Sequence, residues 1–218
     1  MYNADEYTDV ASVRYKADIS AENALSILDA YSIDFDIPNP FVTGGRPRRT
    51  VNPNHEEIIL CRAVLLDDYS TEADIVAHCI EDSLDSAECE KYRETYEKDL
   101  LRNDMFRIRL SMETGFAEKS LDPDHWIMYI ENSEGVIIEP ADIALSDVVS
   151  SQDSMYSPYL RRDIPRRLMM RDVTLYFREM TFFGSDLLGS GNDYITLVIT
   201  REKKTLARVV WKTSPDQE

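Results

Sequence analysis

Near the end of the chain lies the stretch Asp193-Tyr-Ile-Thr-Leu-Val-Ile-Thr-Arg-Glu-Lys-Lys-Thr-Leu-Ala-Arg-Val-Val-Trp-Lys212. Its hydrophobic residues recur at every second position, which is the spacing of a β-strand with one buried face. The charged run Arg201–Lys204 separates the two halves, so the stretch predicts a β-hairpin. The predicted inner faces carry Ile195, Leu197 and Ile199 on the first arm and Ala207, Val209 and Trp211 on the second.

Four more segments upstream of this hairpin predict strands. Alternation is clear from Met105 to Met112 and again from Val173 to Phe177. Trp126–Glu131 and Val136–Glu139 flank the turn Asn132-Ser-Glu-Gly135, which predicts a second hairpin. Residues 141–157 are less regular and predict a short helix or a loop. The C-terminal half is therefore expected to form a mainly antiparallel sheet or a small β-sandwich.

The N-terminal half shows mainly helical spacing. Ser20 predicts the cap of a helix over about residues 21–31, Thr71 begins a capping-box pattern that leads into a second helix, and Ser86 caps a third that runs to about Leu101. Residues 34–54 contain repeated Pro and Gly and predict a long loop. Residues 57–66 are apolar at consecutive positions, which fits either a buried strand or a short buried helix.

These patterns together predict an α+β fold in which helices from the N-terminal half pack on strands from the C-terminal half. We expect residues 1–18 to be a polar tether or a frayed helix, since they carry only a loose apolar stripe. Residues 19–214 are expected to form a single domain, helix-rich over 19–104 and strand-rich over 105–212.

Composition limits the classes of function. The chain has 218 residues, is 43% hydrophobic and carries a formal net charge of −17, which is typical of a folded and soluble acidic protein. Such a charge disfavours binding to nucleic acid and to anionic lipid, because both depend on Lys and Arg. Apolar runs are too short to cross a membrane, and the acidic start lacks the apolar core of a signal peptide. Two expectations remain: a cytoplasmic protein, or an exported or lipid-anchored one whose leader has been removed.

The three cysteines, Cys61, Cys79 and Cys89, are too few for a disulfide scaffold and lack C-x-x-C spacing. The sequence favours buried free thiols, because a free Cys behaves as a small hydrophobic residue. A bridge between Cys79 and Cys89 stays open, since both fall in neighbouring predicted helices.

No catalytic, cofactor or metal site is predicted. The chain contains none of the common phosphate-loop, dinucleotide, nucleophile-elbow or zinc-protease motifs. Its histidines, His55, His78 and His125, are far apart in sequence. If the fold gathered them with carboxylates in one pocket, an enzyme would become the better interpretation.

The segment Tyr156–Arg171 is the strongest candidate for a contact surface, because it concentrates Arg, Tyr and Met within an acidic chain. The alternative is an irregular connection whose arginines pair with the acidic helices. The predicted partner-binding residues are Tyr156, Tyr159, Arg161, Arg162, Arg166 and Arg167.

We therefore expect a non-enzymatic binding or structural module with a protein partner and no cofactor. It is expected to be the soluble part of an exported or lipid-anchored bacterial protein, with an extracytoplasmic location slightly favoured over the cytoplasm. The alternatives are a cytoplasmic acidic adaptor that binds a basic protein and, less favoured, an enzyme with a dispersed site. The sequence leaves the oligomeric state open.

Overall fold

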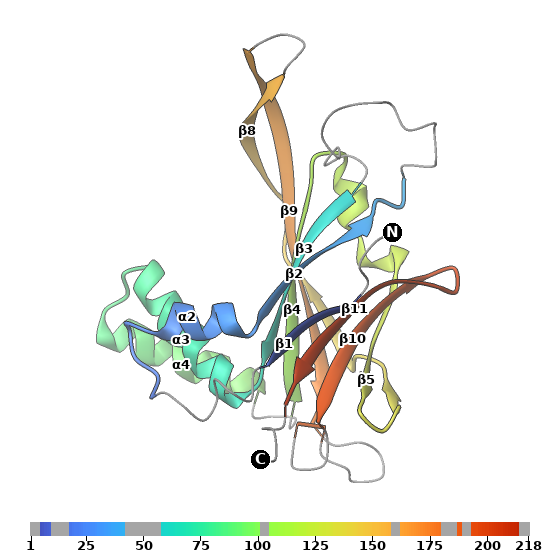
Figure 1. The fold of residues 1–218 in the computed structure, drawn as a ribbon. Coiled ribbons are helices and arrows are strands. Elements are labelled where there is room, and N and C mark those ends of the chain that lie inside the picture. Colours follow the sequence, from blue (N-terminus) through green and yellow to red (C-terminus); the bar gives the residue numbers. More distant parts are fainter. Residues whose placement is uncertain are drawn as a thin grey trace.

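The computed structural model describes residues 5–9, 18–41, 58–100, 105–157, 162–179, 187–188 and 193–213. Within these ranges only the backbone is described for 5–9, 97–100, 153–157 and 162–166. Two sheets lie against each other, and three helices flank one of them (Figure 1).

Sheet A contains the predicted terminal hairpin at its centre. Its strands follow the order β1-β11-β10-β5-β6. Ile195, Leu197 and Ile199 of β10 face Trp211, Val209 and Ala207 of β11 across the hairpin, and all six are buried, as predicted. All neighbouring pairs are antiparallel except β1 with β11, which is parallel. The strand bounds are β1 Asp5–Asp9, β5 Ile127–Asn132, β6 Ile137–Ile138, β10 Tyr194–Arg201 and β11 Lys204–Lys212.

Sheet B is antiparallel throughout and follows the order β2-β3-β4-β9-β7. A sixth strand, β8, pairs with β9 alone among the described strands. The bounds are β2 Ser32–Pro38, β3 Ile58–Leu66, β4 Met105–Thr114, β7 Asp142–Leu145, β8 Val149–Ser157 and β9 Arg162–Arg178.

The helices come from the N-terminal half and lie together on one side of sheet B (Figure 1). They are α2 Ala24–Ala30, α3 Asp68–Glu81 and α4 Ser86–Leu100, and two short 3₁₀ turns, η1 Glu118–Leu121 and η2 Pro123–His125, precede β5. The predicted α+β class, with helices from the first half packed on a largely antiparallel sheet structure, is confirmed.

Helix α3 begins about one turn before the predicted cap at Thr71. Asp67 is the N-cap, and its carboxylate accepts a hydrogen bond from the backbone N–H of Ser70 at 2.9 Å. The Ser70 hydroxyl in turn accepts from the Asp67 N–H at 2.9 Å, which completes a capping box. Asp is a stronger N-cap than Thr, so the helix starts at the better signal.

The hydrophobic core lies between the two sheets. Along sheet B, one row of paired residues runs Ile33, Ala63, Leu110 and Val173, and all four are buried. Trp211 of sheet A is fully buried, and its indole N–H donates to the backbone oxygen of Tyr31, next to β2, at 2.9 Å. This bond ties the two sheets together inside the core.

Four segments differ from the sequence prediction. Ser32–Pro38 forms β2 although residues 34–54 predict a loop. Asp142–Leu145 forms β7 and Val149–Ser157 forms β8, where a short helix or a loop is expected over residues 141–157. Asp5–Asp9 pair with β11, whereas the sequence predicts a tether or frayed helix there. In each case the backbone N–H and C=O groups of an adjacent strand are available for hydrogen bonding. Pairing with that strand outweighs the low strand propensity of the segment's own sequence.

Candidate functional site

The outer face of sheet B, turned away from sheet A, is only partly covered by the helices. Because side chains alternate along each strand, the residues beside the core row point outward. One outward row is Val64, Arg109 and Thr174, and the next is Asp34, Arg62, Ser111 and Asp172. This face therefore carries a set of polar and charged groups that the core does not use.

Asp74 of α3 attaches the helices to this face. Its carboxylate binds the Arg109 guanidinium in a two-pronged ion pair, with N–O distances of 2.8 and 3.1 Å, and it also accepts from the Tyr96 hydroxyl of α4. Burial would lower the pKa of Arg109, but Asp74, together with Tyr96 and Asp172, more than offsets this effect, so the pKa is raised. Burial raises the pKa of Tyr96, against the opposing charge of Arg107, whose guanidinium lies 4.3 Å from the ring centre. Asp74 therefore holds α3, α4 and β4 together through an ion pair and a hydrogen bond.

A cleft opens where the helical layer ends. It has a volume of about 300 Å³ and lies between α2, α3, α4 and the outward side of β4 and β9. We call it the outer-face cleft. Its polar lining consists of Asp74, His78, Glu81, Tyr92, Arg109, Ser111 and Asp172.

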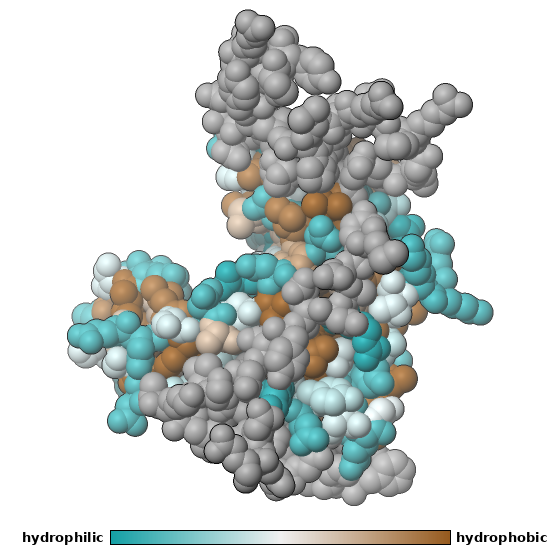
Figure 2. All heavy atoms as spheres, in the orientation of Figure 1, coloured by the Kyte–Doolittle hydropathy of each residue, from teal (hydrophilic) through white to brown (hydrophobic). Residues whose placement is uncertain are grey.

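A second hollow of about 300 Å³ adjoins the outer-face cleft and shares Ser111 and Asp172 with it. Its lining is more apolar and includes Phe35, Leu60 and Met170. The Ser111 hydroxyl donates to the Asp172 carboxylate at 2.6 Å, at the boundary between the two hollows. Hydrophobic residues also gather on the visible face above the helices, around the region where Figure 1 places β3 and β9 (Figure 2).

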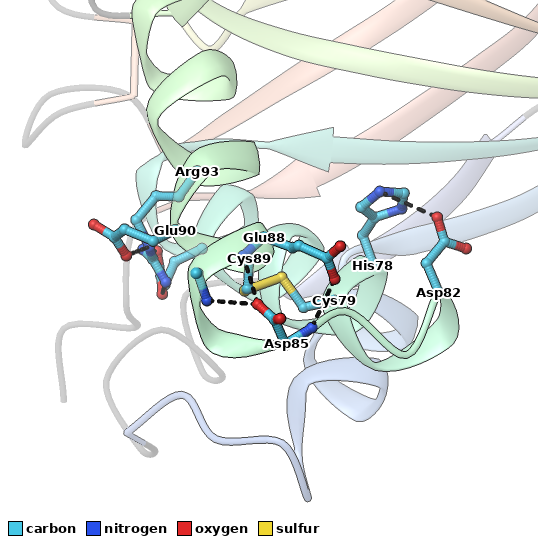
Figure 3. The surroundings of a disulfide bond; sticks show 10 residues. His78, Cys79, Asp82, Asp85, Glu88, Cys89, Glu90 and Arg93 are labelled. Carbon is cyan, nitrogen blue, oxygen red and sulfur yellow. Dashed lines mark hydrogen bonds and ion pairs between the residues drawn. A yellow bond between two sulfur atoms is a disulfide. The ribbon is translucent and has the colours of Figure 1, made fainter.

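His78 lies in the outer-face cleft with three carboxylates, which is the kind of arrangement that would indicate an enzyme. Its ring Nε2, however, lies 3.5 Å from Asp82, one turn along α3 (Figure 3), and the ring packs on Tyr92 with centroids 4.0 Å apart. Ser111 donates to Asp172 and not to the histidine, so a serine–histidine–acid relay is not formed. His125 contacts the Lys119 carbonyl oxygen at 3.0 Å, and His55 lies outside the described residues.

The cysteines correct part of the sequence prediction. Cys79 and Cys89 form a disulfide that joins the end of α3 to the start of α4, beside the Asp85 carboxylate that caps α4 (Figure 3). The sequence favours free thiols at both positions, but the short turn at residues 82–85 brings the two helix ends together. Cys61 is free and buried, as expected, and burial raises the pKa of its thiol.

The described part of the predicted contact segment belongs to two paired antiparallel strands and not to an irregular connection. Strand β4 pairs with β9 only as far as Met169, whereas β8 continues along β9 through seven further pairs, from Ser151 with Leu168 to Ser157 with Arg162. At about 3.4 Å per residue, this extension is about 20 Å long. In Figure 1 it projects away from both the helices and sheet A. We call residues 151–157 and 162–168 the β8–β9 arm.

Four of the six predicted contact residues belong to this arm. Arg167 is exposed on β9. Tyr156, Arg162 and Arg166 belong to the two strands, although only their backbone is described. Tyr159 and Arg161 lie outside the described residues. The outer-face cleft, by contrast, is not anticipated by the sequence, because its lining comes from five separate elements.

Two other features are absent from the described residues. In that part of the chain, no group of three or more His, Cys, Asp or Glu side chains is arranged to hold a metal ion. Across the same residues, the structure contains no helix long and apolar enough to span a membrane.

Comparison with known proteins does not assign a family. No protein family model matches this chain, and no curated protein matches it at a significant level.

Proposed function

We propose that this chain is a non-enzymatic binding module that contacts a protein partner through the β8–β9 arm. The observation that carries this proposal is the length of the arm beyond the last pairing of β9 with β4 at Met169. The arm also contains the segment that the sequence marks by its arginines, and Arg167 is exposed on it.

The physics of small sheets supports a partner for the arm. A two-stranded hairpin without a third strand or a covering helix is marginally stable in water. A partner strand or surface placed against it would supply further packing, and the strand edges that pair with no described strand offer backbone groups for pairing. Since the arm is rich in Arg while the chain carries a net charge of −17, a partner with an acidic face fits the arm best.

The disulfide between Cys79 and Cys89 supports an exported location, because such bonds persist in oxidising compartments and are rare in the cytosol. We therefore propose the soluble part of an exported or lipid-anchored protein. The alternative, a cytoplasmic acidic adaptor for a basic protein, is favoured only by the net charge.

Site-specific photocrosslinking in the source cells tests the arm directly. A photoreactive residue in place of Arg167 is expected to give a discrete crosslinked product with one partner protein, because this side chain is exposed on the arm. The control variant carries the photoreactive residue in place of Lys204, which is exposed on β11 of sheet A.

The proposal requires a product from position 167 that is absent or much weaker from position 204. If equal products form at both positions, or none forms at 167 while 204 gives one, the arm is not the contact element. A product at neither position would also contradict a stable protein partner at the arm.

A further inference from the structure

The outer-face cleft has features of a ligand site that are independent of the β8–β9 arm. Its volume of about 300 Å³, like that of the adjoining hollow, lies at the lower end of the range for small-molecule pockets. Polar side chains from α3, α4, β4 and β9 converge on it, which is typical of sites that fix the orientation of a ligand.

The charge of the cleft is negative. Arg109 is neutralised by Asp74 through the two-pronged pair, so these residues add no net charge. The Asp172 carboxylate accepts a hydrogen bond from the Ser111 hydroxyl and its charge also acts on Arg109, while Glu81 makes no ion pair with any described residue. Since Asp74, Glu81 and Asp172 face the cleft together with one arginine, the described lining keeps a net negative charge.

Tyr92 adds an aromatic surface to the cleft. Its pKa is raised first by burial and then by the charge of Asp74, against the opposing charges of Arg109 and Arg107. Its ring packs on His78 with centroids 4.0 Å apart, so two aromatic rings line one wall. Aromatic faces attract cations in addition to the attraction from carboxylates.

The adjoining hollow supplies an apolar surface next to these carboxylates. Met170 is 44% exposed there, and Leu60 and Phe35 lie beside it. Since the two hollows share Asp172 and Ser111, one ligand can place a charged end in the cleft and an apolar body in the hollow. An anion would meet Glu81 and Asp172, and a purely apolar molecule would leave them unpaired.

We propose that the outer-face cleft binds an amphipathic organic cation, with its ammonium or guanidinium group at Asp172 and Glu81 and its apolar body over Met170 and Leu60. This site goes beyond the protein contact proposed for the arm, and either proposal can fail without the other.

Titration with phenethylamine tests the charge requirement. It combines an ammonium group with an aromatic body, and 2-phenylethanol and phenylacetate have closely similar bodies with neutral and negative ends. We expect saturable binding of the amine by NMR, with the largest shifts at the amides of His78, Ser111 and Asp172. The neutral analogue should bind at least about tenfold more weakly, because a charge-assisted hydrogen bond contributes enough for such a factor.

Paired substitutions test the residues. The double variant Glu81→Gln and Asp172→Asn preserves side-chain shape and should weaken phenethylamine binding about tenfold or more. The control Glu134→Gln makes the same kind of change in an exposed side chain of the β5–β6 turn in sheet A, and should leave binding unchanged. Thermal unfolding of each variant shows whether the fold is kept.

Two kinds of ligand combine a cationic group with an apolar group: a small organic amine, and a protein segment in which a basic residue follows an apolar one. Titration with acetyl-Leu-Arg-amide separates these sources, since tighter binding than phenethylamine indicates a protein segment and weaker binding a small molecule. The proposal is overturned if neither probe gives saturable shifts at the cleft, or if phenylacetate binds as well as the amine. Full binding by a folded Glu81→Gln and Asp172→Asn variant would overturn it too.

Discussion

At the scale of single residues, Asp74 connects a helix, a second helix and a strand. Only about a tenth of its side chain is exposed, and it bonds Arg109 of β4 and the Tyr96 hydroxyl of α4. The surface pair of Arg62 with Asp29 has a similarly short distance of 2.6 Å, but the Asp29 side chain is 77% exposed. Burial, and not distance, decides which of these pairs stabilises the fold.

We expect Asp74→Asn to lower the free energy of unfolding by about 2–3 kcal/mol, because it leaves the partly buried Arg109 guanidinium without its counter-charge. Asp29→Asn removes the same charge from the exposed pair and should cost less than about 1 kcal/mol. Urea denaturation followed by circular dichroism measures both values. Equal losses in the two variants would show that Asp74 does not anchor the helices.

At the scale of elements, the strands that could be predicted are those with one buried face. In the terminal hairpin and in β4, apolar and polar residues alternate. They alternate because one face of each strand is buried in the core between the sheets. Strand β2 has the same alternation in Ile33-Asp-Phe-Asp-Ile37, but the prolines that follow these residues favour a loop in the sequence. Pro38 is tolerated because it ends a strand at the edge of sheet B.

Strand β8 could not be predicted in this way. Its sequence, VSSQDSMYS, has no alternating apolar residues, because most of its length lies in the two-stranded arm, where no second layer formed by described residues covers it. The outer-face cleft could not be predicted from the sequence for a different reason. Ser111 and Asp172 are 61 positions apart in sequence, and only the register between β4 and β9 brings them together.

The disulfide is an element-scale constraint, because it fixes the turn between α3 and α4. We expect the double variant Cys79→Ala and Cys89→Ala to lose about 2–3 kcal/mol of stability, the value for closing a loop of about ten residues. A reducing agent should lower the urea midpoint of the wild-type protein and leave that of the double variant unchanged. A wild-type midpoint that does not respond to reduction would contradict the bond.

At the scale of the whole molecule, the two sheets share one core, and Trp211 spans the boundary between them. Its side chain is fully buried in sheet A, and its N–H is bound to the Tyr31 oxygen beside sheet B. Buried residues from both sheets and from α2 and α3 belong to the same hydrophobic cluster. Sequence predicts that Trp211 faces inward, but the residue it meets across the core lies 180 positions away.

We expect Trp211→Ala to lower the free energy of unfolding by about 3–5 kcal/mol, because it creates a large cavity and removes a buried hydrogen bond. Tyr194→Ala, in the same hairpin but 39% exposed, should cost less than about 1 kcal/mol. Urea unfolding measured by circular dichroism compares them. A small effect at Trp211 would mean that the two sheets do not depend on their shared core.

At the same scale, we propose that a stable two-sheet body carries the β8–β9 arm, whose arginines bind a protein partner. The most direct test is the yield of the photocrosslinked product from Ser151, on the arm, in a variant with Arg161, Arg162, Arg166 and Arg167 all changed to Ser. A control variant with Arg178, Arg201, Lys203 and Lys204 changed to Ser removes the same charge elsewhere. We predict that the arm variant loses the product while its thermal midpoint stays close to that of the control, which keeps the product. An arm variant that crosslinks as well as the control, or one that unfolds, would contradict the claim.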